Sequence, residues 1–338
     1  MPLIMCALCV VSFYSSRALT SQVRAWALSH AMMDVPNARS LHVAPTPRGG
    51  GLAIVIVVLA LEALLLASGL LGADLESAPW GWAGWIATLC LALIGLQDDL
   101  KSLSAARRLV LQLAVCAAWT IWTFGITTDL PAMIPLVLQI LAMVWLVNLY
   151  NFMDGSDGLA ATQAIGASAL GGLLAWWLGL ENIAYLSLLV AGSSAGFLYW
   201  NWQPAKIFLG DVGSYFLGGQ FAILSAAMVR EGQLPWIWAI LLAPFVVDAS
   251  LTLARRIMQG ERWLTAHRTH AYQLLTQSGW SHGRVARGLA WLIVLICFPL
   301  AAVSVWQPTL APYCMLLAYT VLATIWFRIV FLTTRHPA

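Results

Sequence analysis

Charged side chains are scarce in this chain of 338 residues: Asp, Glu, Lys and Arg together make up 9% of it, against 61% hydrophobic residues. Ordinary soluble domains carry about 25% charged residues, so this composition excludes a surface that faces mainly water. Apolar runs of about 20 residues recur along nearly the whole sequence, each long enough to cross a hydrocarbon core as a helix. Because these runs leave no room for a separate soluble domain, we predict one integral membrane domain over residues 1–338.

Paired cysteines and a basic N-terminal lead-in are also missing. The six cysteines are scattered through apolar stretches, which excludes the close spacing of a zinc site or a disulfide framework and leaves them as packing or lipid-facing residues. The apolar start of the chain is not preceded by the basic residues of a signal peptide. Arg17 and Arg24 follow it instead, so we expect a retained first helix whose C-terminal end lies in the cytoplasm.

The apolar runs predict an all-α, polytopic transmembrane helical bundle of about eleven spans. The expected spans are residues 3–24, 50–72, 80–97, 108–126, 131–149, 159–179, 183–200, 213–230, 235–255, 286–306 and 310–330. With the N-terminus outside, alternate loops collect nearly all of the Lys and Arg residues, and the positive-inside rule places those loops in the cytoplasm. The basic residues are therefore a topological signal, and we expect membrane lipid but no nucleic acid as a partner.

Asp98 and Asp99 stand side by side where the third predicted span meets the cytoplasm. Adjacent carboxylates repel each other unless a divalent cation or another positive charge compensates. A metal or proton-transfer role is therefore at least as good an interpretation as solvated charges at a helix end.

Two Asn and two Asp recur every three residues across the end of the fifth predicted span: Asn148, Asn151, Asp154 and Asp157. The spacing places them along one side of a helix and the turn that follows. Amides and carboxylates on one side, next to two glycines that let a ligand approach the backbone, suit a hydrated or phosphorylated group. Helix capping, the alternative, accounts for Asp157 only.

A third polar cluster precedes the eighth predicted span and contains Lys206, Gly210, Asp211 and Ser214. Backbone amides at a helix start favour phosphate, Lys206 adds a positive charge, and Asp211 could bind magnesium through oxygen. This combination is usual for phosphoryl transfer. A capped helix start explains Ser214 but not Lys206 and Asp211 together.

The longest cytoplasmic loop carries His267, Arg268 and His270. The two histidines can share one helical face. Beside Arg268 they suit a diphosphate better than a zinc ion, for which no cysteine or third histidine stands nearby.

In the first cytoplasmic loop, prolines restrict the backbone, and glycines allow backbone conformations that other residues rarely adopt. The loop is therefore suited to hold a fixed shape. Arg39, His42 and Arg48 could line an anion site in this loop. Capping of the second span is an equally good explanation of the glycine run at residues 49–51.

Taken in order, these loops resemble the polyprenyl-phosphate N-acetylhexosamine-1-phosphate transferases. Five motifs between Asp34 and about Gln273 carry the resemblance, and their shared order argues against coincidence. The motifs are Asp34-x-Pro with Arg39, His42 and Pro45-Thr-Pro-Arg-Gly-Gly-Gly; Asp98-Asp99; Asn148-x-x-Asn151-x-x-Asp154-Gly-x-Asp157-Gly; Pro204-Ala-Lys206-x-Phe-x-Gly210-Asp211-x-Gly-Ser214; and a terminal histidine motif.

The motifs and the resemblance together assign a role to each polar residue, with Mg²⁺ as the cofactor and Mn²⁺ as its substitute. The residues expected to be catalytic are Asp98, which acts on the lipid phosphate, Asp99, Asp211 and His270, and the expected metal ligands are Asp211 and Asp99. The expected substrate-binding residues are Arg39, His42, Arg48, Arg108, Asn148, Asn151, Asp154, Asp157, Lys206, His267 and Arg268. Many relatives carry a His-x-His-His cluster where this chain reads His270-x-Tyr272-Gln273.

The resemblance implies transfer of an N-acetylated amino-sugar 1-phosphate from a UDP-sugar to undecaprenyl phosphate, with release of UMP, at the cytoplasmic face of a bacterial inner membrane. The compact last loop looks most like the subgroup that starts O-antigen chains. Which amino sugar is used, and whether the chain forms a homodimer, stay open at this point.

Two other activities also stay open. A membrane prenyltransferase would show paired Asp-x-x-x-Asp clusters in two loops, whereas only Asp98-Asp99 is present. A cation-coupled transporter would place acids at mid-membrane, where Glu62 and Asp248 are the candidates. For Glu62 we expect a buried structural partner.

Overall fold

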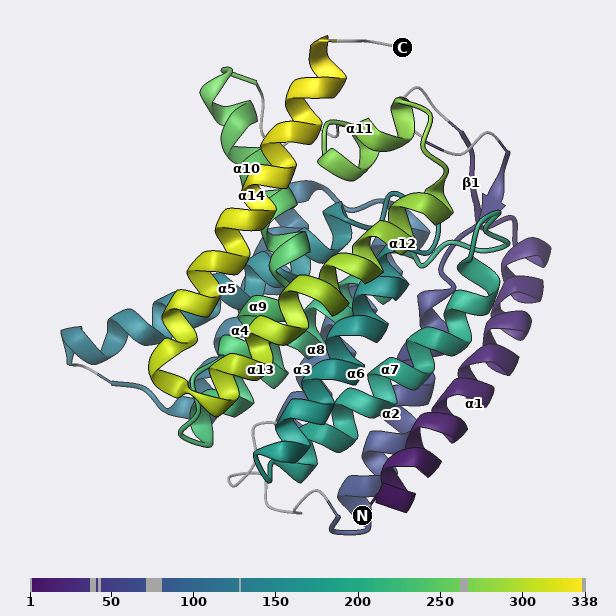
Figure 1. Cartoon of the computed structure of the whole chain (residues 1–338). Helices are drawn as coiled ribbons and strands as arrows, with labels where there is room; N and C mark the ends of the chain where they lie inside the picture. Colours follow the sequence, from purple (N-terminus) through teal and green to yellow (C-terminus); the bar gives the residue numbers. More distant parts are fainter. Residues whose placement is uncertain are drawn as a thin grey trace.

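The chain folds as a bundle of long helices, and the computed structural model describes residues 2–36, 41, 44–70, 81–127, 129–261 and 267–335 of it (Figure 1). Within these residues the only strands are β1 (Met33–Asp34) and β2 (Thr46–Pro47). They pair antiparallel, with Met33 opposite Pro47, and so close the base of the first polar loop.

The helices follow the apolar runs of the sequence. In chain order they are α1 (Pro2–Ser29), α2 (Gly51–Ala67), α3 (Trp82–Lys101), α4 (Ala105–Phe124), α5 (Leu130–Phe152), α6 (Leu159–Trp177), α7 (Glu181–Asn201), α8 (Gly210–Arg230), α9 (Trp236–Leu241), α10 (Ala243–Met258), α11 (Ala271–Gln277), α12 (His282–Leu292), α13 (Phe298–Trp306) and α14 (Ala311–Arg335). A π-helical turn, η1 (Ile293–Cys297), joins α12 to α13, and a 3-10 turn, η2 (Pro308–Leu310), precedes α14.

Every expected span coincides with helix, and the differences lie at the ends and at one break. α3 continues through Asp98 and Asp99, and α8 begins three residues before the expected residue 213, so these acids and Asp211 stand in helical turns. The expected span 235–255 is interrupted between α9 and α10, where Pro244 occupies the first turn of α10 and removes an N–H donor. The short helix α11 was not expected.

The chain is a multi-pass membrane protein. Within the described residues, eight helices are long and apolar enough to cross a membrane: Leu3–Ser29, Trp82–Lys101, Leu130–Phe152, Leu159–Trp177, Glu181–Asn201, Gly210–Arg230, His282–Trp306 and Pro308–Thr333. α2 is a shorter apolar helix. The start of α1 and the end of α14 lie at opposite ends of the bundle, as an odd number of crossings between them requires (Figure 1). The count of about eleven spans stays a prediction.

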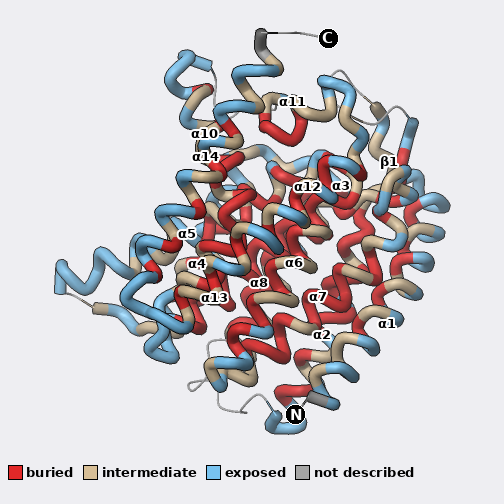
Figure 2. Tube along the Cα trace, in the orientation of Figure 1, coloured by how far each residue is buried: buried red, intermediate tan, exposed pale blue. Residues whose placement is uncertain are grey.

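Burial is concentrated in the middle of the bundle, around α8, and the exposed residues form its rim (Figure 2). Many of the exposed side chains are large and apolar, for example Tyr14 on α1, Val137 on α5 and Phe327 on α14. Such a surface is stable where lipid tails replace water as the solvent. The helices therefore associate through close packing of small residues rather than by hiding apolar side chains from water.

Glycines allow the closest of these helix contacts. A Cβ at Gly192 of α7 would lie 2.1 Å from Ser12 Oγ of α1, and one at Gly196 would lie 2.3 Å from the Phe13 carbonyl oxygen. Between α3 and α8, a Cβ at Gly95 would lie 2.2 Å from the Asp211 carbonyl oxygen. The helices are therefore in close contact at these points. The contact at Gly95 fixes the position of the first turn of α8 along α3.

Glu62 lies on α2, is 2% exposed and is close to the side chain of Gln220 on α8. One of its carboxyl oxygens, Oε2, and the Gln220 amide nitrogen have no hydrogen-bond partner among the described residues. The buried structural partner that we expected for Glu62 therefore stays a prediction.

Glycine packing between α1 and α7 gives a stability prediction. Gly196→Ala should destabilise the protein by about 1–3 kcal/mol, because the new methyl group overlaps the α1 backbone. Gly288→Ala is the matched control: nothing beyond its own stretch of helix lies within 4 Å of the position that its Cβ would take, so alanine there should be neutral or stabilise by about 0.5–1 kcal/mol. Thermal unfolding in detergent measures both, and equal midpoints for the two variants would contradict the prediction.

Candidate active site

A polar cavity of about 230 Å³ lies at the end of the bundle where α3 and α5 end and α8 begins. Its lining residues are Asp34, Leu41, Arg48, Asp99, Asn151, Asp154, Gly155, Ser156, Asp157, Asn201, Phe208, Gly210, Asp211, Gln273 and His282. The predicted site residues that meet here are Arg48, Asp99, Asn151, Asp154, Asp157 and Asp211. Three of the sequence motifs thus converge on one cavity together with part of the first polar loop.

Asp99 holds the start of α8. Its Oδ1 accepts a hydrogen bond from the Asp211 backbone N–H at 3.1 Å, and its Oδ2 accepts one from Val212 at 3.0 Å. A carboxylate in this position satisfies backbone donors that a helix start leaves unpaired, and it interacts favourably with the helix dipole. The Arg48 guanidinium donates to the Asp99 backbone carbonyl. Both side-chain oxygens of Asp99 are engaged by α8, and its role as a metal ligand stays a prediction.

Asp98 lies beside the cavity and is 5% exposed. Its Oδ1 accepts a hydrogen bond from the Leu103 N–H at 2.7 Å, and its Oδ2 accepts from Arg108 at 2.9 Å and from the Tyr215 hydroxyl at 3.1 Å. Arg108, which we expected to hold phosphate, therefore forms an ion pair with a carboxylate of the protein. Three donors stabilise Asp98 as an anion.

Asp211 lines the cavity from the first turn of α8. The side-chain amide of Asn151, at the end of α5, donates to Asp211 Oδ1 and to Ser214 Oγ. The carboxyl groups of Asp211 and Asp98 also interact directly. Two carboxyl groups in contact need a proton or a cation between them. The arrangement thus concentrates negative charge around Asp211.

Asp154 lies in the turn between α5 and α6 and lines the same cavity. Burial raises the pKa of Asp154 well above its usual range, and the neighbouring carboxylates of Asp211 and Asp99 raise it further. Both causes favour the neutral form of Asp154, and a positive charge in the cavity would favour its carboxylate.

Asp157 connects the same turn to two distant segments. Its Oδ2 accepts from the Ala205 N–H at 3.1 Å, and its own N–H donates to His282 Nδ1 at 3.0 Å. The next residue, Gly158, donates its N–H to Asn201 Oδ1 at 2.9 Å. Asp157 is thus partly a structural residue, as the capping alternative suggested, although it caps no helix by itself.

The last polar loop contributes Gln273 to the cavity, while His270 lies behind it, at the start of α11. His270 is 3% exposed, and its ring stacks on Phe152 and Tyr272 at centroid distances of 6.4 and 5.8 Å. Its Nδ1 lies 3.5 Å from Asp248 Oδ1 on α10. His270 does not line the acidic cavity itself. Its ring contacts Phe152, which follows the cavity-lining residue Asn151 in the sequence.

His267 is a poor partner for a diphosphate charge. Burial, followed by the electrostatic interactions with His270 and Arg256, lowers the pKa of His267 to about 4. At neutral pH its imidazole is uncharged, so it can donate or accept a hydrogen bond but cannot neutralise phosphate. Arg268 is exposed and does not line the cavity.

Two further predicted binding residues have partners away from the cavity. The Asn148 amide donates to Gln112 Oε1 at 2.7 Å, which joins α5 to α4. The Lys206 ammonium lies 5.4 Å from the ring centroid of Trp200, where a cation–π contact holds it at the surface. Their roles in substrate binding stay predictions, as do those of Arg39 and His42, which lie outside the described residues.

Sequence reasoning gave no role in this site to five residues that support the predicted ones: Asn201, Tyr215, Asp248, Gln273 and His282. The sequence suggested Asp248 only as a mid-membrane acid of a transporter and Gln273 only as part of the last motif. Tyr215 follows Asp211 by four residues and so shares its helical face, which is a signal that could have found it. The other four are brought to the site by contacts between helices far apart in the sequence.

The carboxylates fit a magnesium ion, although no three acidic, imidazole or thiol side chains of the described residues converge as a complete ligand set. Mg²⁺ commonly uses one or two carboxylates and completes its shell with water and substrate phosphates. Asp211 and Asp154 would hold the ion, because both line the cavity and need a positive charge.

Comparison with known proteins agrees with this site. Glycosyl transferase family 4 matches residues 82–229, which include α3 to α8. The probable undecaprenyl-phosphate N-acetylglucosaminyl 1-phosphate transferase of Bacillus subtilis is 31% identical, over 81% of this chain and 77% of that protein. The decaprenyl-phosphate N-acetylglucosaminephosphotransferase of Mycolicibacterium smegmatis is 29% identical, over 86% of this chain and 79% of its own.

A more distant branch is also similar. The phospho-N-acetylmuramoyl-pentapeptide-transferase of Levilactobacillus brevis is 37% identical over 43% of this chain and 45% of that protein. The similarity to the Bacillus subtilis protein covers most of both chains, and the family match contains Asp99, Asn151 and Asp211 of the acidic cavity. The chain therefore belongs to the polyprenyl-phosphate N-acetylhexosamine-1-phosphate transferases, within glycosyl transferase family 4.

Proposed function

We propose that this protein transfers an N-acetylated amino-sugar 1-phosphate from a UDP-sugar to undecaprenyl phosphate in a bacterial inner membrane. The products are undecaprenyl-diphosphate sugar and UMP, and the lipid product starts O-antigen or a related envelope glycan. The observation that carries the proposal is a shared wall between the acidic cavity and a larger apolar cavity. Together they suit an amphiphile with a phosphate head and a hydrocarbon tail.

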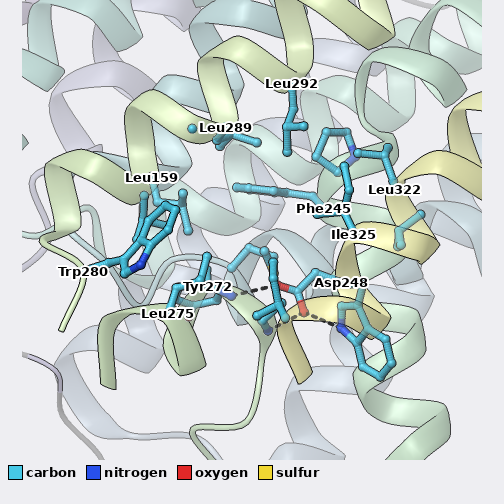
Figure 3. A pocket seen from close by; sticks show the side chains of 18 of the residues that line it. Leu159, Phe245, Asp248, Tyr272, Leu275, Trp280, Leu289, Leu292, Leu322 and Ile325 are labelled. Atoms are coloured by element: carbon cyan, nitrogen blue, oxygen red, sulfur yellow. Dashed lines mark hydrogen bonds between the residues drawn. The ribbon is translucent and has the colours of Figure 1, made fainter. Parts of the chain in front are cut away.

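The apolar cavity has a volume of about 600 Å³ and lies between α10, α11, α12 and α14 (Figure 3). Its lining includes Phe245, Leu275, Leu289, Leu292, Leu322 and Ile325, whose side chains point toward one another in Figure 3. α12 and α14 belong to helices that can cross a membrane, so a hydrocarbon chain in the bilayer has access to this space. Because the isoprenoid chain comes from lipid tails and not from water, the cavity accommodates it through close packing and not through the hydrophobic effect.

Residues that are adjacent in sequence line the two cavities at two places. Met153 and Tyr272 line the apolar cavity, whereas Asp154 and Gln273, which follow them in sequence, line the acidic one. The Tyr272 hydroxyl donates to the Phe152 carbonyl oxygen at 3.0 Å and so closes the wall. This proximity supports binding of one lipid across both environments.

In the proposed reaction, a phosphate oxygen of the lipid attacks the β-phosphorus of the UDP-sugar. A new P–O bond forms, the bond to the bridging oxygen breaks, and that oxygen leaves on UMP. A phosphate monoester has a second pKa of about 6, so the nucleophile is largely ionised at neutral pH without a strong base. The expectation that Asp98 takes a proton is therefore not required.

Asp98 is better suited to hold Arg108 and Tyr215 beside the reacting phosphates. A two-step route, in which Asp98 attacks phosphorus and forms a covalent intermediate, is the alternative mechanism. It is disfavoured because the two oxygens of Asp98 already accept three hydrogen bonds. Mg²⁺, or Mn²⁺ in its place, would neutralise charge on the donor diphosphate when bound at Asp211 and Asp154. Positioning and charge neutralisation then supply most of the rate.

N-acetylglucosamine is the first donor sugar to test, because the Bacillus subtilis and Mycolicibacterium smegmatis relatives are named for it. The choice between sugars depends on a few pocket contacts. Formation of a homodimer is a separate proposal that size determination in detergent would test.

The activity prediction is release of UMP by the purified protein from UDP-N-acetylglucosamine, with undecaprenyl phosphate and Mg²⁺. Asp211→Asn should reduce the rate at least about 100-fold, because it removes a charge beside the diphosphate. A panel of UDP-N-acetyl sugars would identify the donor. No lipid-dependent release from any donor by folded protein would refute the proposed function.

Tyr215→Phe tests the support of Asp98. Loss of one hydrogen bond to a carboxylate costs about 1.5–3 kcal/mol, so kcat should fall about 10- to 100-fold if Asp98 acts beside the phosphates. Tyr319→Phe is the control, because that hydroxyl donates to the Ala239 carbonyl oxygen far from the acidic cavity. Equal activity of the two variants would mean that the Tyr215 hydroxyl does not support catalysis.

Filling the apolar cavity tests where the lipid tail lies. Leu289→Trp should raise KM for undecaprenyl phosphate several-fold and leave KM for a short, soluble prenyl phosphate nearly unchanged, because only the long tail needs this space. Leu295→Trp on the exposed surface of the same helical hairpin serves as the control. A Leu289→Trp enzyme with unchanged KM for the long lipid would place the tail elsewhere.

A further inference from the structure

A second buried carboxylate, Asp248 on α10, lies outside the acidic cavity and is not accounted for by the proposed reaction. It is 7% exposed, and four donors bond to it. Its Oδ1 accepts from the Ala271 N–H at 2.8 Å, the Thr252 hydroxyl at 3.1 Å and the Trp326 indole N–H at 3.1 Å. Its Oδ2 accepts from the Tyr272 N–H at 3.3 Å. The His270 imidazole lies next to these donors, and its Nδ1, 3.5 Å from Asp248 Oδ1, has no hydrogen-bond partner of its own among the described residues.

These bonds make Asp248 the anchor of the last polar loop. The donors come from α10 itself, from the first turn of α11 and from α14, so one carboxylate joins three helices. Since both backbone donors are at the start of α11, Asp248 fixes where that helix begins. His270 is the residue immediately before this start, and its own N–H is held by Gln273 Oε1 at 3.2 Å.

The His270 ring has one nitrogen directed at this anchor. Nδ1 lies 3.5 Å from Asp248 Oδ1, and the ring is confined by Phe152, Tyr272 and His267 at centroid distances of 6.4, 5.8 and 4.9 Å. A carboxylate facing Nδ1 favours a proton on that nitrogen. Nε2 is then the nitrogen that can accept a hydrogen bond from a ligand, or donate to one when the ring is charged.

From this geometry we infer that Asp248 is a positioning residue of the transferase reaction, which sets the tautomer and orientation of His270. The inference rests on the proposed function. Asp248 lines the apolar cavity but not the acidic one, and it is His270 that lies between it and the acidic cavity region. The role also explains why a carboxylate is kept in a helix of an apolar bundle, where a neutral residue could fill the same volume at lower cost.

Asp248→Asn tests the inference, because the amide keeps the size of the side chain but offers an N–H to His270 Nδ1. We expect kcat to fall about 10- to 100-fold, as for other residues that orient a functional histidine, with KM for the UDP-sugar within about twofold of wild type. Thr252→Val is the matched control: it removes a donor to the same oxygen of Asp248 and leaves the His270 contact in place, so its kcat should stay within about threefold.

A double-mutant cycle separates positioning from a general loss of structure. If Asp248 acts through His270, Asp248→Asn should have no further effect on kcat in a His270→Ala background. Additive losses, or a fall in kcat matched by Thr252→Val, would overturn the inference and leave Asp248 as a structural anchor. Wild-type protein without lipid-dependent UMP release would instead refute the proposed function, so the two failures are distinguishable.

Discussion

The Asp99 carboxylate, which accepts hydrogen bonds from the first amides of α8, determines where the other parts of the site lie. These bonds and the backbone contact at Gly95 fix α8 against the end of α3. Asp211, in the first turn of α8, then meets Asn151 at the end of α5. On its other side, the Asp99 carbonyl accepts from Arg48 and holds the first polar loop. A movement of Asp99 would therefore displace residues on three other segments.

The acidic residues of this end of the bundle divide into two groups. The carboxylates of Asp99, Asp157 and Asp248 accept hydrogen bonds from backbone N–H groups of other segments. These bonds join helices and loops where the membrane interior offers no water as a hydrogen-bond partner. Asp211 and Asp154 both line the acidic cavity and lie close enough for their carboxyl groups to interact. The second group is the one suited to a cation and a diphosphate.

The sequence predicted the helices and the gathering of motifs for one physical reason. Apolar runs must span as helices, and alternate loops must then share one side of the membrane, so Asp99, Asn151 and Asp211 meet although they are far apart in sequence. Individual partners could not be predicted in this way. Spacing showed that Asn148 shares a face with Asn151, but not that Gln112 of α4 covers it.

The periodicity of apolar residues could not predict local breaks in the helices either. The interruption before Pro244 and the π-helical turn at residues 293–297 leave the apolar pattern of each span unchanged. The short helix α11 depends on Asp248, which lies 23 residues before the amide of Ala271 that it accepts from. Such an element has little signal of its own in the sequence.

The hydrogen bond between Asp99 and Val212 also has a consequence for how the protein is made. The two residues are 113 positions apart, so the ribosome completes α3 long before it delivers the amides that Asp99 accepts from. Throughout that interval the Asp98-Asp99 pair has no α8 beside it, and the end of α3 must stay at the water interface to keep both acids solvated. The hydrogen bonds that join α3 to α8 through Asp99 therefore form only after α8 has emerged.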